Sequence, residues 1–335
     1  MGFKLAITRT TQTEGKSDVD WDALNEHVIA AAGTAKKARS IPGVITGIYD
    51  LGEQNREDAE FEFNGDAAAE AKEIEAKPDT YFKDGYNGQN KPCRLKCYPQ
   101  KPVQQCAIAV DFPQIVVDKG QFFGKSNPMP LRLLLNGEFS ISGGTRIVGR
   151  PFSVIEKKYD DNTWAFAPNN GLAKLATACE ILDDKGRFTK ERIGELLGKV
   201  ALFEFRVFMK PSKKDSSKSY FTESIKLSGM VPEGLPIPEF SDELLHGINV
   251  SADNDEEALG QLRLSVRNTI KRANNYEGSV IEQEFIALEA SRGGYSSDSS
   301  GGSSSNSSSN DEGDASKPEG AGAEASDDEE DDGPF

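Results

Sequence analysis

The sequence predicts a mainly β protein with helical insertions, of the α+β class, in which a barrel of about five strands precedes a disordered acidic tail. Three observations support this class. Segments with alternating apolar residues recur through the middle of the chain. Short amphipathic segments typical of helices interrupt them. After Tyr295 the only apolar residues larger than alanine are Pro318, Pro334 and Phe335, so this segment has too little apolar surface to offset its ordering entropy.

The elements follow in order. Strands are predicted over 42–54, 105–117 and the hairpin 200–231. Helices are predicted over 20–32, 65–79, 171–182, 189–200 and 253–274, and the segment 127–137 reads as a short helix or an apolar turn. In the last helix, Leu259, Leu262, Val266 and Ile270 form the apolar stripe. Arg263, Arg267 and Lys271 recur on a neighbouring face, either as solvated bases or as nucleic-acid contacts.

The hairpin combines a core face with a basic and aromatic face. Phe203, Phe205, Val207 and Met209 alternate onto one side, and Phe221, Ile225 and Leu227 continue that side on the return strand. The opposite side and the connecting segment supply the candidate contacts to DNA, namely Arg206, Phe208, Lys210, Lys213, Lys214, Lys218 and Tyr220. An ordinary solvated lysine loop is the alternative.

A second basic region runs from Gly85 to Val110 and contains no acid. Its bases and one tyrosine are candidate contacts to phosphates and bases, namely Lys91, Arg94, Lys96, Tyr98 and Lys101. The alternative is that acids from another segment compensate these charges.

A third set lies between the first two along the chain. Phe122 and Phe123 are flanked by lysines, and adjacent aromatic residues in a strand cannot both face the core. Trp164 is either a core residue or a platform for base stacking. The candidate contacts of this set are Phe122, Phe123, Lys125, Arg146, Arg150, Phe152, Lys157, Lys158 and Trp164.

The formal net charge of −16 resides mostly in the tail. Residues 293–335 carry twelve acids and one base, a net charge of −11, which leaves −5 for residues 1–292. The four cysteines lack the paired spacing and the nearby histidines of a zinc site, so we expect reduced thiols, no metal and no cofactor. No long apolar run predicts a membrane span or a secretory signal.

The last nine residues read DDEEDDGPF. A terminal ring and a proline behind six acids are typical of a peptide that docks in an apolar cleft with a basic rim. This end resembles the acidic tip of the bacterial single-stranded DNA-binding protein (SSB) family, in which a Gly/Ser-rich linker precedes Asp-Asp-Asp-Ile-Pro-Phe. The residues that match are Asp331, Asp332, Pro334 and Phe335, whereas Gly333 replaces the apolar residue before proline.

The resemblance implies an oligonucleotide-binding (OB) fold in residues 1–290, a disordered linker over 291–326 and a protein-interaction tip over 327–335. It implies sequence-independent binding of single-stranded DNA, recruitment of replication, recombination and repair proteins by the tip, no enzymatic activity, and a phage-encoded protein acting in the bacterial cytoplasm. Two alternatives are a nuclease-like enzyme, which needs clustered acids for metal ions, and an adaptor that acts through its tail alone.

Overall fold

A central, mainly antiparallel sheet forms the body of the protein, in which one short strand pairs in parallel. The structure, a computed structural model, describes residues 19–212 and 217–291. Seven strands of this part of the chain form the main sheet, and five of them follow one another in the order β13 (Ser219–Gly229), β12 (Val200–Pro211), β1 (Arg39–Gln54), β5 (Val103–Asp118) and β6 (Pro128–Leu134). The short strands β14 (His246–Ile248) and β9 (Phe152–Ser153) pair with β1 and β5. The prediction of a mainly β protein with helices is therefore confirmed.

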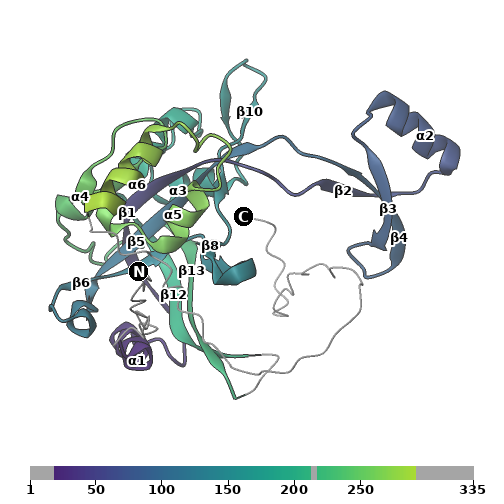
Figure 1. Ribbon diagram of the computed structural model, residues 1–335. Helices are drawn as coiled ribbons and strands as arrows, with labels where there is room; N and C mark the ends of the chain where they lie inside the picture. The colour runs from purple at the N-terminus through teal and green to yellow at the C-terminus, as the bar shows by residue number, and fades with distance from the viewer. Residues whose placement is uncertain (1–18, 213–216, 292–335) are drawn as a thin grey trace, which may run out of the picture.

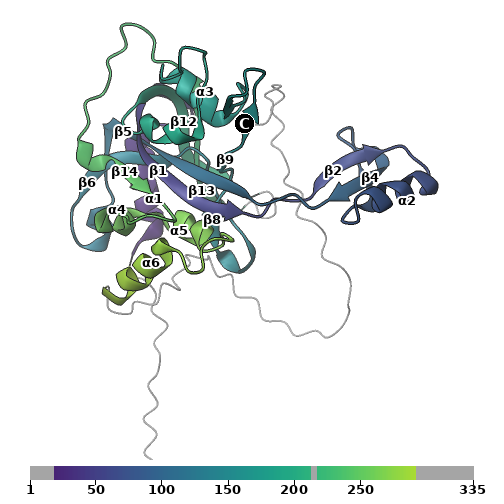
Figure 2. The ribbon, with the colours of Figure 1, turned by 90° about the horizontal axis from the view of Figure 1, so that it is seen from above.

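Two apolar clusters lie on opposite sides of β1 and β5. Ile108 and Val110 face one cluster, whereas Ala107 and Ala109 face the other, as strand alternation requires. The helices α1 (Trp21–Ala32) and α3 (Gly171–Ala178) contribute to the first cluster. The second cluster is covered by α4 (Glu256–Gln261), α5 (Leu264–Ile270) and α6 (Val280–Ser291), which gather on one side of the body in Figures 1 and 2.

An arm projects from the body on the long ends of β1 and β5 (Figures 1 and 2). It consists of α2 (Ala67–Ala76) and a separate sheet in the order β2 (Ala59–Phe63), β4 (Pro92–Tyr98) and β3 (Tyr81–Tyr86). Gly52, with a φ of 73°, allows the bend at the root, where a Cβ would come within 2.5 Å of Ala273. The loop after α5 braces this root, because Asn274 N donates to Glu53 O at 2.8 Å.

The remaining elements are short hairpins and 3₁₀ helices. Two small hairpins pair β7 (Glu138–Ser140) with β8 (Arg146–Val148) and β10 (Glu156–Lys158) with β11 (Trp164–Phe166). The 3₁₀ helices are η1 (Gly120–Phe123), η2 (Ser142–Gly144), η3 (Lys190–Leu196) and η4 (Asp242–Leu244).

Four local predictions were wrong. The segment 127–137 is the edge strand β6, which pairs with β5, instead of a helix or turn. The helix predicted over 253–274 is two helices, because Leu262 and Arg263 take extended backbone angles. The segment 189–200 folds mainly as the 3₁₀ helix η3, and Phe122 and Phe123 belong to the 3₁₀ helix η1 rather than to a strand. For β6, the pairing with β5 decided a segment whose local pattern was ambiguous.

Arg263 joins the two outer strands of the sheet path. No backbone pairing between β6 and β13 is present in the described part of the chain. Instead the Arg263 guanidinium donates to Glu223 of β13 at 2.7 Å and to the carbonyl of Arg132 on β6. Glu138 lies 3.5 Å from the same guanidinium. Although burial lowers the pKa of Arg263, the two carboxylates raise it well above its usual range, so this buried group is charged.

Candidate nucleic-acid interface

The outer face of the β12–β13 hairpin presents bases and aromatic rings. Phe203, Phe205 and Val207 are buried as predicted, whereas Met209, predicted on the same side, is 39% exposed toward the tip. The alternate residues point away from the core. The Arg206 guanidinium lies 4.1 Å from the centre of the Phe208 ring. Further toward the tip, Lys210 and Tyr220 pair across the strands, and Tyr220 is 54% exposed. Charge and aromatic surface therefore alternate along one face.

The same face carries little negative charge. Lys226 pairs with Glu204 at 3.2 Å near the base of the hairpin. Beyond Glu204, the paired positions on this face hold serine and threonine opposite Arg206 and Phe208. Lys218 is exposed near the tip, and Lys213 and Lys214 lie outside the described residues. A polyanion meets no carboxylate on the described part of this face beyond Glu204.

A second exposed aromatic residue stands on the β10–β11 hairpin. Trp164 is 56% exposed and pairs across the strands with Lys158, so it lies outside the core. Next to it, Lys157 Nζ and the Arg187 guanidinium lie 4.4 Å and 4.0 Å from the centre of the Tyr159 ring. Lys157, Lys158 and Trp164 were predicted from the sequence, whereas Arg187 was not, because its segment is distant in the sequence.

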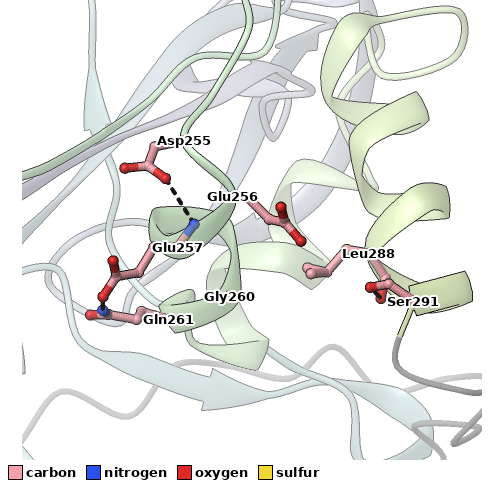
Figure 3. A pocket seen from close by; sticks show the side chains of 7 residues that line it. All are labelled: Asp255, Glu256, Glu257, Gly260, Gln261, Leu288 and Ser291. Carbon is pink, nitrogen blue, oxygen red and sulfur yellow. Dashed lines mark hydrogen bonds between the residues drawn. The ribbon is translucent and has the colours of Figure 1, made fainter.

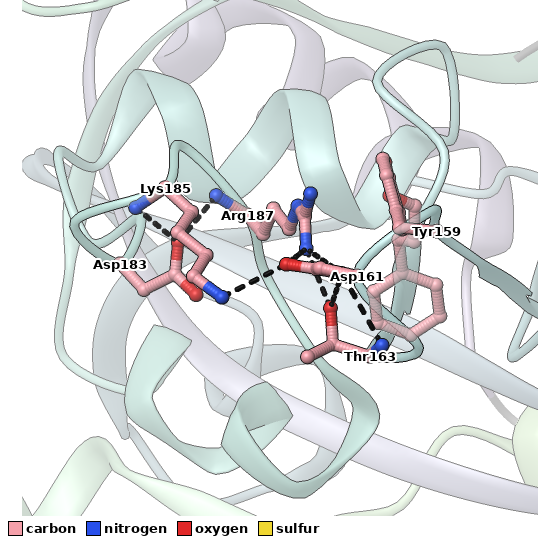
Figure 4. Close-up of polar contacts among 7 residues, drawn as sticks. Tyr159, Asp161, Thr163, Asp183, Lys185 and Arg187 are labelled. Carbon is pink, nitrogen blue, oxygen red and sulfur yellow. Dashed lines mark hydrogen bonds and ion pairs between the residues drawn. The ribbon is translucent and has the colours of Figure 1, made fainter.

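An ion-pair network holds the turn of this hairpin (Figure 4). The Asp161 carboxylate accepts from Lys185 Nζ at 2.8 Å and from Arg187 Nη1 at 2.8 Å, and its other partner is the Thr163 hydroxyl at 2.6 Å. Hydrogen bonds from Lys185, Thr163 and Arg187 hold the pKa of Asp161 well below its ordinary value. The loop that contains Lys185 therefore braces the hairpin that presents Trp164.

We expect Asp161→Asn to loosen this hairpin. The substitution removes the charge that holds Lys185 and Arg187, so the amide hydrogen of Tyr159, which donates to Thr163 O at 2.9 Å, should exchange several-fold faster. Hydrogen exchange measured by NMR or mass spectrometry checks this. Asp160→Asn makes the same charge change one residue away, at an exposed position, and should leave the exchange rate unchanged.

The contribution of Asp161 to the stability of this hairpin should be lost at acidic pH. Because the folded-state pKa of Asp161 is depressed, its stabilising contribution is present above the unfolded-state pKa of about 3.9 and is lost as the pH falls below it. Exchange at this hairpin, corrected for the intrinsic rate, should therefore rise below about pH 4. An Asp161→Asn protein with the same acid transition as the wild type would contradict this role.

On the arm, acids from α2 and β3 compensate part of the basic region. Arg94 pairs with Glu70 at 2.8 Å and with Asp84 at 3.0 Å, and Lys96 pairs with Glu73 at 2.6 Å. The expectation that these two charges are uncompensated was wrong, because residues absent from the basic stretch pack against it. Their contact with DNA stays a prediction, as it does for the exposed Lys91 and Lys101.

An aromatic pair lies beside these charges. The rings of Tyr98 and Phe61 stack with their centres 5.8 Å apart, and Phe61 is 55% exposed. Lys77 Nζ lies 5.5 Å from the centre of the Tyr98 ring. Tyr98 was predicted from the sequence, whereas Phe61 and Lys77 were not, because only the folding of the arm brings them next to Tyr98.

The remaining candidates divide between surface and core. Phe152 packs against the first apolar cluster, where a Cβ on Gly171 would come within 2.4 Å of its ring, so Phe152 has a packing role. Arg146 lies 3.7 Å from Glu138, and Arg150 is exposed. The other three residues lie in η1 or two positions after it. Phe122 packs against His27, Phe123 is 58% exposed beside Trp21, and Lys125 is exposed.

The structure does not collect these residues into one patch. The arm, the β10–β11 hairpin and the β12–β13 hairpin leave the body in different directions, and the two hairpins lie at opposite ends of the view in Figure 1. The β12–β13 hairpin brings together the largest number of the predicted residues on one continuous face.

Acidic side chains line the hollow between α4 and the end of α6 (Figure 3). Asp255, Glu256 and Glu257 stand at the start of α4, where they suit the helix dipole and would repel phosphate. Within residues 19–212 and 217–291, no group of three or more His, Cys, Asp or Glu side chains is placed to hold a metal ion. None of the four cysteines forms a disulfide bond in this part of the chain.

No helix in the described ranges is long and apolar enough to cross a membrane. Comparison of this chain with protein-family models, with curated proteins and with solved structures finds no match in any of the three.

Proposed function

We propose that the protein binds single-stranded DNA without sequence preference, through the outer face of the β12–β13 hairpin. The alternation of Arg206, Phe208, Lys210 and Tyr220 on that face carries the proposal. Unpaired bases stack on exposed rings while cations neutralise the neighbouring phosphates. A duplex keeps its bases stacked inside the helix, so it gains only the electrostatic part.

The strand order is compatible with an OB-like barrel, which is the fold we propose for the body. The path from β13 to β6 would close if the two outer strands met, and Arg263 already contacts both of them. The helix α3 lies between β6 and β12 along the chain and packs into the first apolar cluster. The arm is then an insertion between the first two strands of the barrel.

The proposed partners are single-stranded DNA and, through the tip Asp331, Asp332, Pro334 and Phe335, proteins of replication, recombination and repair. The tip lies outside the described residues, and its resemblance to the SSB family supports this part of the proposal. We propose a non-enzymatic role in the cytoplasm of a bacterial host.

Titration with labelled oligonucleotides over a salt series tests the function. Trp21 and Trp164 are the only tryptophans and are 49% and 56% exposed, so fluorescence reports on binding, and Trp21→Phe isolates the signal of Trp164. We expect single strands of different sequence to bind alike, duplex to bind much more weakly, and affinity to fall steeply with salt. Equal affinity for duplex and single strand would overturn the proposal. Magnesium-dependent shortening of the oligonucleotide would favour an enzyme.

A further inference from the structure

A hollow lies between α1 and the edge of β12. It has a volume of about 690 Å³. Its lining comes from α1, from the connector after it and from the hairpin, and comprises Glu26, Ile29, Ala30, Gly33, Ala35, Lys36, Lys37 and Met209. The α1 residues recur at helical spacing, so they form one face of that helix.

Contacts on both sides join the hollow to the outer face of the hairpin. Beside β12, the Thr34 side chain makes the hydrogen bonds that the backbone of β1 makes elsewhere. Val207 N donates to the Thr34 hydroxyl at 2.8 Å, and this hydroxyl donates to Val207 O at 3.3 Å. One residue along each segment, Arg206 Nη2 donates to Ala35 O at 2.9 Å. The connector is thus fixed to β12 between the Arg206–Phe208 pair and the lysines of the hollow.

The chemistry of the lining is divided along the helix. Ile29, Ala30 and Met209 provide an apolar surface, and Met209 is 39% exposed. Lys36 and Lys37 are exposed just beyond the C-terminus of α1, and no carboxylate in the described ranges is in an ion pair with either ammonium group. Glu26 lies two helical turns before Gly33, about 10 Å away along the axis.

We propose that this hollow holds one nucleotide of a bound single strand. The base lies against Ile29, Ala30 and Met209, and Lys36 and Lys37 neutralise the adjacent phosphates. This site rests on the proposed function and extends it. Met209 lies on the opposite side of β12 from Arg206, so a strand on the outer face of the hairpin reaches the hollow by passing around the strand edge at the Arg206–Ala35 contact.

The charge part of the site is tested with Lys36→Gln/Lys37→Gln. If each lysine neutralises one phosphate, the slope of log K against log salt becomes shallower by about 1.4, and the affinity at 0.1 M salt falls by about tenfold or more. Lys72→Gln/Lys190→Gln removes the same charge from exposed positions on α2 and η3 and should change neither quantity. An unchanged slope in the Lys36/Lys37 variant, with wild-type binding intact, would overturn the site and leave the proposed function standing.

The base part is tested with an oligonucleotide that carries 5-iodouracil, cross-linked to the full chain by light and mapped by mass spectrometry. We expect a cross-link to Met209 itself, and we expect Ala30→Phe, which fills the hollow from an exposed position, to abolish it without changing the salt slope. Cross-links confined to other residues, including the neighbouring Phe208 of the outer face, would overturn the proposal. The proposal would also be overturned if a synthetic DDEEDDGPF peptide bound in the hollow and DNA gave no cross-link there. The occupant of the hollow would then be an acidic peptide. No binding of single strands by the wild type would instead refute the proposed function.

Discussion

Arg263→Ala should lower the free energy of unfolding by about 3–5 kcal/mol, the largest stability effect that we expect from a single substitution in this protein. The substitution leaves Glu223 and Glu138 without their main cation at a site from which water is largely excluded, since their side chains are only 16% and 12% exposed. Although burial raises the pKa of Glu223, the positive charge of Arg263 holds that pKa below its ordinary value, so the carboxylate is charged in the folded protein. Urea denaturation followed by circular dichroism measures the loss.

Two further variants sharpen this test. Arg272→Ala removes an exposed arginine from the residues after α5 and should change stability by less than about 0.5 kcal/mol. Adding Glu223→Gln to Arg263→Ala removes one of the stranded charges and should recover part of the loss. A destabilisation below about 1 kcal/mol for Arg263→Ala would show that the two outer strands do not depend on this contact.

Phe208→Ala/Tyr220→Ala should weaken single-strand binding by about 30-fold or more. Each stacked base contributes about 1–3 kcal/mol, so two lost platforms cost at least about 2 kcal/mol. The slope of log K against log salt should stay unchanged, because both substitutions leave the phosphate contacts in place. Equilibrium titration at several salt concentrations measures both quantities.

The matched control for this pair is Ile286→Ala, which removes a 54% exposed apolar side chain from α6. Its affinity should equal that of the wild type. Because Phe208 is half-buried, thermal unfolding of the double variant verifies that the body is still folded. If the double variant is folded and binds with wild-type affinity, the binding face does not lie on this hairpin.

The alternation of the β12–β13 hairpin was predictable because it is a local property. Buried Phe203 and Phe205 fix which side of the strand faces the core, and the opposite side follows from strand geometry alone. The N-terminal helix and the exposed α2 were also predicted, since capping aspartates and apolar spacing mark them in the sequence.

Non-local charges were the main source of error. The acid-free stretch around Arg94 looked uncompensated, yet Glu70 of α2 folds back over it. Likewise Arg263 follows the helical spacing of a solvated base but is buried between two strands from distant parts of the chain. Lys36 and Lys37 were not among the predicted contacts, because the neighbouring Met209 is contributed by a strand far along the sequence.

The root of the arm has an evolutionary consequence. Gln54 and Val103, where the arm begins and ends, are direct partners in the β1–β5 ladder. Everything between them is therefore topologically a single loop of an antiparallel hairpin, and a tight turn joining these two residues would preserve every register of the main sheet. The arm is a module that a lineage can gain, exchange or discard in one genetic event without redesigning the body that carries it.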